Sequence, residues 1–116
     1  MKILSLSAAT LAVVVAALAF AGSASAATPS FKCWSASKPA EHAICDSNYL
    51  SKLDRKMAFW YGRALNRAGY FDQVSWLKKQ QRQWLWQRNS CRWDESCLAS
   101  QYNWRIQALR NYAEHV

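Results

Sequence analysis

Four cysteines in two close pairs limit the possible folds of this chain more than any other feature. They stand at positions 33, 45, 91 and 97 of 116 residues. Four cysteines allow three disulfide pairings, and the short spacings favour Cys33 with Cys45 and Cys91 with Cys97. Loop-closure entropy gives these bonds roughly 3 and roughly 2.5 kcal/mol of stabilisation. Neither pair has the two-residue gap of a zinc knuckle, and the two histidines lie far apart, so we predict disulfides, no metal site and no cofactor.

The N-terminus has the features of a secretory signal. An apolar run at residues 11–20 is followed by small residues at Ala24 and Ala26, a pattern typical of a signal peptide that is removed. The run is too short to favour a membrane span. A lipoprotein would carry a cysteine directly after the cut, where this chain has Ala27. We expect residues 1–26 to be removed and the product to be soluble and exported, either periplasmic or secreted, with no lipid anchor and no transmembrane segment.

The mature part, residues 27–116, is small and basic. It is long enough for one domain, but a chain this short buries only roughly two-thirds of the surface that it exposes when unfolded. The whole chain has a formal net charge of +8, and removal of Lys2 with the signal leaves +7. Such a charge favours acidic partners. Nucleic acid is the least favoured polyanion, because the product is exported.

Apolar residues after position 47 recur at intervals of three and four, which is typical of amphipathic helices. We predict helices over about residues 47–69, 72–91 and 94–113, preceded by a short helical segment at residues 39–45 that has Pro39 in its first turn. The connections are short, so sequential helices should be antiparallel neighbours. The sequence therefore predicts an all-α fold: a small antiparallel three-helix bundle with a short N-terminal helical segment, clipped by two disulfides.

Polar residues and a glycine mark the expected helix ends. Asp46 or Ser47 is placed to cap the first long helix, and Gly69 follows it at a position where a left-handed residue is usual. Asp72 is placed to cap the second helix, and the third should begin around Asp94. These signals predict the helix boundaries.

Three charged residues fall on the inward faces of the expected helices: Asp54, Arg88 and Arg105. An unpaired charge in that position would be costly. We therefore predict that Asp54 forms a partly buried ion pair with one or both arginines. A carboxylate between arginines has a lowered pKa and suits neither acid nor base catalysis at neutral pH. The predicted role of the pair is structural.

No catalytic group is recognisable in the sequence. The helical pattern brings no serine, histidine and aspartate together, and no glycine-rich phosphate loop is present. His42 stands beside Glu41 in the Cys33–Cys45 loop, where a single histidine is more often a surface residue than a base. We predict that the protein is not an enzyme.

The outward helical faces combine cations with aromatic residues. Arginine and tryptophan are the side chains that most often anchor interfaces, and tryptophan also stacks on sugars. We predict a partner surface on the first and second long helices, made of Lys52, Arg55, Phe59, Arg63, Trp76, Lys79, Gln83 and Trp86. The alternative is that Trp76 or Trp86 packs against the N-terminal segment around Phe31 and Trp34.

Four segments together resemble one family. They read "FKCWSASKPAEHAIC", "LDRKMAFWYGRAL", "QRQWLWQRNSC" and "CLASQYNWRIQALR", and in this order and spacing they are similar to the lysozyme inhibitor LprI-like domain family. The resemblance covers residues 31–110. The matching positions are Cys33, Ala43, Ile44, Cys45, Leu53, Asp54, Tyr61, Gln81, Arg82, Trp84, Leu85, Arg88, Cys91, Cys97, Leu98, Arg105, Ile106 and Leu109.

The resemblance implies an exported all-helical domain and, from the member that gives the family its name, inhibition of lysozyme. The first functional hypothesis is therefore a lysozyme-inhibitor-like envelope-defence protein whose partner is a lysozyme. The net charge and the outward tryptophans and lysines support a second, a binder of anionic cell-envelope polymers or lipid head groups. A third is an interaction module for another exported protein.

Overall fold

The chain is all-helical in the computed structural model, which describes residues 27–115. No strand occurs in this part of the chain, so the all-α prediction is confirmed. The predicted signal peptide lies outside the described residues. The elements are a 3₁₀ turn, η1 (Cys33–Ser35), and four α-helices, α1 (Pro39–Asp46), α2 (Asn48–Tyr70), α3 (Val74–Ser90) and α4 (Glu95–His115).

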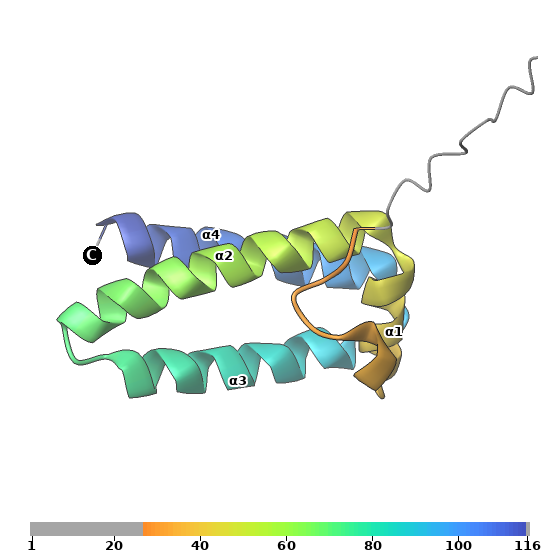
Figure 1. Cartoon of the computed structure of the whole chain (residues 1–116), viewed down its shortest axis with the longest axis horizontal. Helices are drawn as coiled ribbons and strands as arrows, with labels where there is room; N and C mark the ends of the chain where they lie inside the picture. Colours follow the sequence, from red (N-terminus) through yellow and green to blue (C-terminus); the bar gives the residue numbers. More distant parts are fainter. Residues whose placement is uncertain (1–26, 116) are drawn as a thin grey trace, which may run out of the picture.

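The helices form a bundle in which α1 closes one end (Figure 1). The chain direction reverses from α2 to α3 and again from α3 to α4 (Figure 1). Helices α2 and α4 make the most extensive contact with each other, and α3 makes less contact with either. Large side chains of α3 fill the space towards them. The indole of Trp84, for example, is buried and donates a hydrogen bond to the carbonyl of Gln101 at 3.3 Å.

The fourth helix corrects the predicted helix count. We expected three helices and a short N-terminal helical segment at residues 39–45. That segment is the helix α1, a full member of the core, to which it contributes Ala40, Ala43 and Ile44. Ile44 is completely buried, and the burial of its side chain stabilises the fold by about 1.5–3 kcal/mol. Its partners in the core come from α2, α3 and α4 and include Leu50, Met57, Leu77, Trp84, Leu98, Tyr102 and Leu109.

Two helices start where they were expected to start, and each has a side-chain cap. The hydroxyl of Ser47 accepts a hydrogen bond from the Leu50 N–H at 3.1 Å. A carboxylate oxygen of Asp94 accepts one from the Cys97 N–H at 3.0 Å. Each bond satisfies an N–H group that the first helical turn leaves unpaired.

The turn between α2 and α3 differs from the prediction. Gly69 lies inside α2, and the left-handed residue is Asp72, with a φ of 55°. Asp72 is therefore not the cap of α3, whose N-cap is Gln73. The N–H of Gln73 bonds back to the carbonyl of Ala68 at 2.8 Å and closes the turn, so the left-handed residue lies three positions later than expected. Aspartate tolerates the left-handed region better than most residues because its short polar side chain can bond locally.

Both predicted disulfides are confirmed. Cys33 pairs with Cys45 and so fastens η1 to α1. Cys91 pairs with Cys97 and connects the end of α3 to the first turn of α4. No helix within residues 27–115 is both long enough and apolar enough to cross a bilayer.

Candidate functional site

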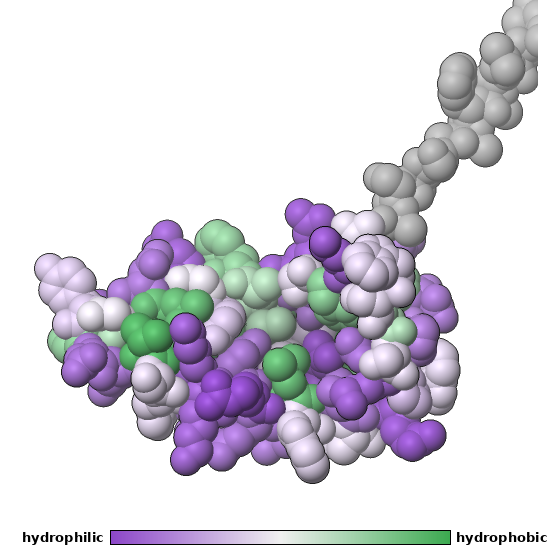
Figure 2. All heavy atoms as spheres, turned by 60° about the horizontal axis from the view of Figure 1, so that its bottom comes forward, coloured by the Kyte–Doolittle hydropathy of each residue, from purple (hydrophilic) through white to green (hydrophobic). Residues whose placement is uncertain are grey.

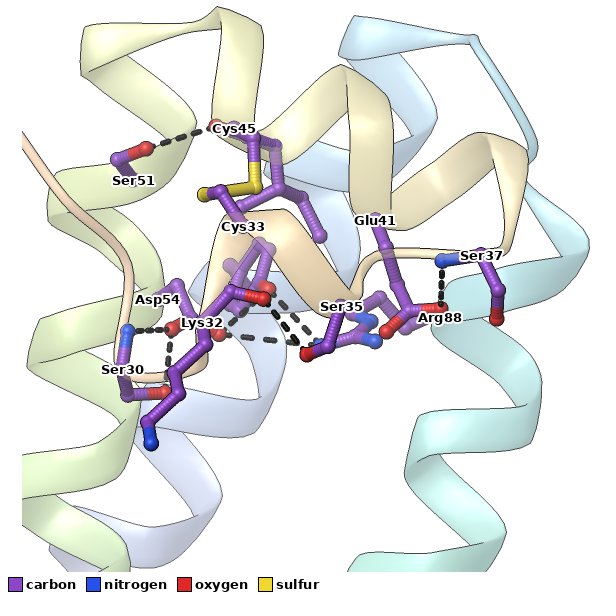
Figure 3. Close-up of a disulfide and its surroundings, with 12 residues drawn as sticks. Ser30, Lys32, Cys33, Ser35, Ser37, Glu41, Cys45, Ser51, Asp54 and Arg88 are labelled. Carbon is purple, nitrogen blue, oxygen red and sulfur yellow. Dashed lines mark hydrogen bonds and ion pairs between the residues drawn. A yellow bond between two sulfur atoms is a disulfide. The ribbon is translucent and has the colours of Figure 1, made fainter.

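A buried polar network surrounds Asp54 in the interior of the bundle. Asp54 is 0% exposed. One of its oxygens accepts a hydrogen bond from the Tyr102 hydroxyl at 2.7 Å and lies 3.8 Å from Nη1 of Arg88. The other oxygen accepts the backbone N–H of Ser30 at 2.6 Å and also the Ser30 hydroxyl (Figure 3). Both carboxylate oxygens therefore have donors, as a buried charge requires.

Arg105, the other expected partner of Asp54, does not take part in this network. Its Nε donates instead to the Gln81 side chain at 3.0 Å. Arg105 is only 6% exposed, and its Nη2 has no hydrogen-bond partner among residues 27–115. Burial lowers its pKa, although the nearby Tyr61 opposes that shift. Arg105 is thus a buried cation without a carboxylate partner in the described part of the chain.

Tyr102 completes the network because it bridges two helices. Its hydroxyl donates to Asp54 and accepts from Arg88 at 3.2 Å. Burial raises the pKa of Tyr102 well above its usual value, and the negative charge of Asp54 adds to the shift. The phenol therefore stays neutral and keeps its proton for Asp54. The arrangement fixes α2, α3 and α4 relative to one another and offers no free acid or base.

The most exposed large hydrophobic side chain on α3 is Trp86, which is 83% exposed. Its ring stands between two hollows. Arg82 and Gln83 line one of them, and Lys38, Pro39, Asn89, Ser90 and Arg92 line the other. We call Trp86 with Lys38, Arg82, Gln83 and Arg92 the Trp86 surface. Hydrophilic residues predominate on the side of the molecule where α3 lies, and apolar residues there form separate patches (Figure 2).

The remaining residues of the predicted partner surface do not join this group in one hollow. Trp76 belongs to another hollow, between α3 and α4, and packs on Tyr112 with 5.8 Å between ring centroids. Phe59 of α2 packs edge-on against Trp60 at 5.2 Å. The other predicted residues are exposed: Lys52, Arg55, Arg63 and Lys79. The predicted surface is therefore divided between separate parts of the molecule.

The alternative packing of the tryptophans against the N-terminal segment is not observed. Trp86 is mostly exposed, Trp76 contacts α4, and Trp34 is itself largely exposed. Phe31 lies instead beside Arg88, whose guanidinium carbon is 5.7 Å from the ring centroid.

The three cations of the Trp86 surface were not among the predicted partner-surface residues, and Arg82 was named only as a position that matches the family. Lys38 is the N-cap residue of α1, and Arg92 occupies a left-handed position, with a φ of 54°, in the turn between α3 and α4. The Cys91–Cys97 disulfide holds that turn. Only the packing of α1 against the end of α3 brings Lys38 and Arg92 to the same hollow.

Comparisons with protein-family models, with curated proteins and with solved structures found no match for this chain. The resemblance to the lysozyme inhibitor LprI-like family therefore stays a prediction. Among residues 27–115, no three potential ligands of the histidine, cysteine, aspartate and glutamate types come together as a metal site would need.

Proposed function

We propose that this protein is an exported binding protein that acts as a lysozyme-inhibitor-like envelope-defence protein, periplasmic or secreted, on a scaffold of three antiparallel long helices. The observation that carries the proposal is the exposure of Trp86 between the cations Arg82 and Arg92. An exposed indole buries a large apolar area when a partner covers it. Tryptophan and arginine are also the residues most enriched at the energetic centres of interfaces.

The chemistry of a lysozyme cleft fits such a surface. The cleft of a glycoside hydrolase is shaped for a sugar chain and carries a pair of carboxyl groups beside the scissile bond. The ring of Trp86 offers a flat face of the kind that stacks on sugars and would occupy a sugar subsite. Arg82 or Arg92 would bond a cleft carboxylate through its planar guanidinium. Inhibition would then follow from occupation of the cleft.

The net charge of the protein implies a preference among lysozymes. The common animal lysozymes are strongly basic, and the mature chain carries a formal charge of +7. Like charges slow diffusional association at long range. We expect faster association with lysozymes of neutral or acidic net charge, and a faster association with basic lysozymes when salt is raised.

The test is a turbidity assay of bacterial cell-wall lysis with oxidised, signal-free protein and a panel of lysozyme types. The expected result is inhibition of at least one type at micromolar excess, strongest for the less basic ones. Reduced and alkylated protein serves as the control, because it lacks the disulfides that fasten η1 to α1 and α3 to α4. Failure to inhibit any type overturns the proposal.

A second candidate is a binder of anionic envelope polymers or lipid head groups. The observation that favours it is the exposure of cations on the outer faces of both α2 and α3, including Lys52, Arg63 and Lys79. Binding of this kind weakens steeply with salt. An interaction module for another exported protein is the third candidate, and stoichiometric recovery of one protein from an envelope extract would favour it.

A further inference from the structure

A groove runs between α2 and α3, on the side of α3 that faces α2. Its volume is about 530 Å³, inside the range of about 300–1,000 Å³ that is usual for small-molecule sites. Each helix contributes one face, because the lining residues on it recur at spacings of three and four. The walls include Met57, Ala58 and Tyr61 from α2 and Lys78, Arg82 and Leu85 from α3.

The end of the groove nearest α1 is closed by the N-terminal segment. Phe31 lines the groove there, and its ring lies against the guanidinium of Arg88. Ser30 is held in place by Asp54, which it contacts through both its N–H and its hydroxyl (Figure 3). An apolar group that enters the groove would therefore meet Phe31 at this end.

The two carboxylates that line the groove already have donors. Asp54 is bound by Ser30, Tyr102 and Arg88 as described above. An oxygen of Glu41 accepts the backbone N–H of Lys38 at 3.0 Å, which closes the first turn of α1. Among residues 27–115, neither carboxylate makes an ion pair with Lys78 or Arg82.

Two groove cations have no acidic partner. Lys78 and Arg82 make no ion pair among residues 27–115, and they stand one helical turn apart on α3, on the same face as Leu85. The part of the groove beside Lys78 and Arg82 is therefore positively charged. Its walls at Met57, Ala58 and Leu85 are apolar.

Arg105 adds to the positive potential from within the bundle. It is buried, has no carboxylate partner in the described part of the chain, and bonds to Gln81, which also lines the groove. Burial raises the pKa of the Tyr61 hydroxyl, while Arg105 and Arg82 act in the opposite direction. Tyr61 and Arg82 line the same groove, and the Tyr61 hydroxyl remains a hydrogen-bond donor at neutral pH.

We propose that this groove binds an amphiphilic anion, a single alkyl chain that ends in a carboxylate or a phosphate. The head group is held by Lys78, Arg82 and the Tyr61 hydroxyl. The chain lies over Met57, Ala58 and Leu85 towards Phe31. The cations require a negative head group, and the apolar walls require a chain, so neither a small inorganic anion nor a neutral amphiphile meets both conditions. The site does not depend on inhibition of lysozyme, although Arg82 borders both the groove and the Trp86 surface.

Calorimetric titration of the oxidised protein tests the proposal directly. The probes are sodium dodecanoate, dodecyl phosphate and the neutral dodecyl maltoside, each below its critical micelle concentration. We expect saturable binding of one anion per protein for dodecanoate, dodecyl phosphate or both. The anion that binds more tightly shows whether the groove prefers a carboxylate or a phosphate head group. Binding of dodecyl maltoside as tight as that of the anions, or no binding of either anion, overturns the proposal.

Variants locate the binding within the groove. The double variant Lys78→Gln, Arg82→Gln should weaken anion binding at least about tenfold, the effect expected from the loss of charge-assisted hydrogen bonds. The matched control Arg63→Gln, Lys79→Gln removes the same charge from exposed positions that do not line the groove. Ala58→Phe narrows the groove without a change of charge and should also abolish binding. Equal affinity in the two double variants, or unchanged affinity in the Ala58→Phe protein with an unaltered thermal midpoint, contradicts the proposal.

Discussion

The hydroxyl of Tyr102 on α4 donates a 2.7 Å hydrogen bond to the carboxylate of Asp54 on α2, across 48 residues of sequence. Both side chains are fully buried. A buried carboxylate that loses a donor retains its desolvation cost, so this contact matters more to stability than its single hydrogen bond suggests. It joins the two helices that make the most extensive contact in the bundle.

Replacement of Tyr102 by phenylalanine should therefore destabilise the fold. Asp54 would keep its bonds to Ser30, but its other oxygen would face only Arg88, at 3.8 Å. We expect a loss of about 1.5–3 kcal/mol, the range for a hydrogen bond to a charged group. Urea unfolding measures the loss. Tyr112→Phe removes an exposed hydroxyl that bonds to Gln73 and is the matched control, with an expected change within about 0.5 kcal/mol. Equal free energies of unfolding for the two variants would show that the buried hydrogen bond contributes no more to stability than the exposed one.

The same network predicts how stability changes in alkali. Burial raises the pKa of Tyr102 above its unfolded value of about 10. Folding therefore favours the protonated phenol, and the resulting stabilisation is complete below about pH 10 and is lost as pH rises above it. The phenolate absorbance of the native protein minus that of the Tyr102→Phe variant should stay near zero at pH 10. Its rise should coincide with unfolding, and a rise in the still-folded protein would contradict the burial effect.

Each disulfide should contribute measurably to stability. The bonds close loops with sequence separations of 12 and 6, so loop entropy gives roughly 3 and roughly 2.5 kcal/mol. Cys33→Ser with Cys45→Ser should cost the larger amount. It should also speed amide exchange at Ser30, because η1 is then no longer fastened to α1. Urea unfolding and hydrogen exchange of the two double variants test this order, and a larger loss in the Cys91→Ser, Cys97→Ser protein would reverse it.

The helical repeat explains how much of the interior could be predicted. The spacing of apolar residues placed Asp54 and Arg88 on inward faces, and the structure puts them 3.8 Å apart. A repeat cannot, however, show which polar groups a buried side chain meets, and the contact of Asp54 with Tyr102 was not predicted. The bond from Ser30 arises because the N-terminal segment crosses α2, and no local rule encodes that path.

The Trp86 surface was harder to predict, because helical periodicity does not show which residues of other elements pack beside a helix. Helical periodicity identified Trp86 and Gln83 as outward-facing, since both lie opposite the core residues of α3. Lys38 and Arg92 join them only through tertiary packing and an unusual turn conformation. At the α2–α3 turn, we expected Gly69 to be the left-handed residue and Asp72 to be the cap of α3, and both expectations were wrong. The left-handed residue is Asp72, because α2 continues through Gly69 to Tyr70.

The affinity for anionic surfaces should depend on the salt concentration and on the charge of the exposed side chains. If the exposed cations bind lipid head groups, affinity for vesicles of equal phosphatidylglycerol and phosphatidylcholine should fall steeply between about 50 and about 200 mM salt. Lys79→Glu on α3 should weaken that binding, and Lys52→Glu provides a matched charge reversal on α2. A larger effect of Lys79→Glu assigns the contact to the α3 face. Salt-insensitive binding would argue against the anionic-polymer function.

The contribution of Trp86 to lysozyme inhibition is the most direct test of the proposed function. The inhibition constant of the wild type should be compared with those of Trp86→Ala and Trp104→Ala, against the lysozyme type that the turbidity panel finds most sensitive. Trp104 is 62% exposed on α4, so its variant removes the same type of ring outside the Trp86 surface. We predict that Trp86→Ala weakens inhibition at least about tenfold, as expected for an interface hot spot, and that Trp104→Ala changes it less than about threefold. Equal inhibition by the wild type and Trp86→Ala would contradict the proposal.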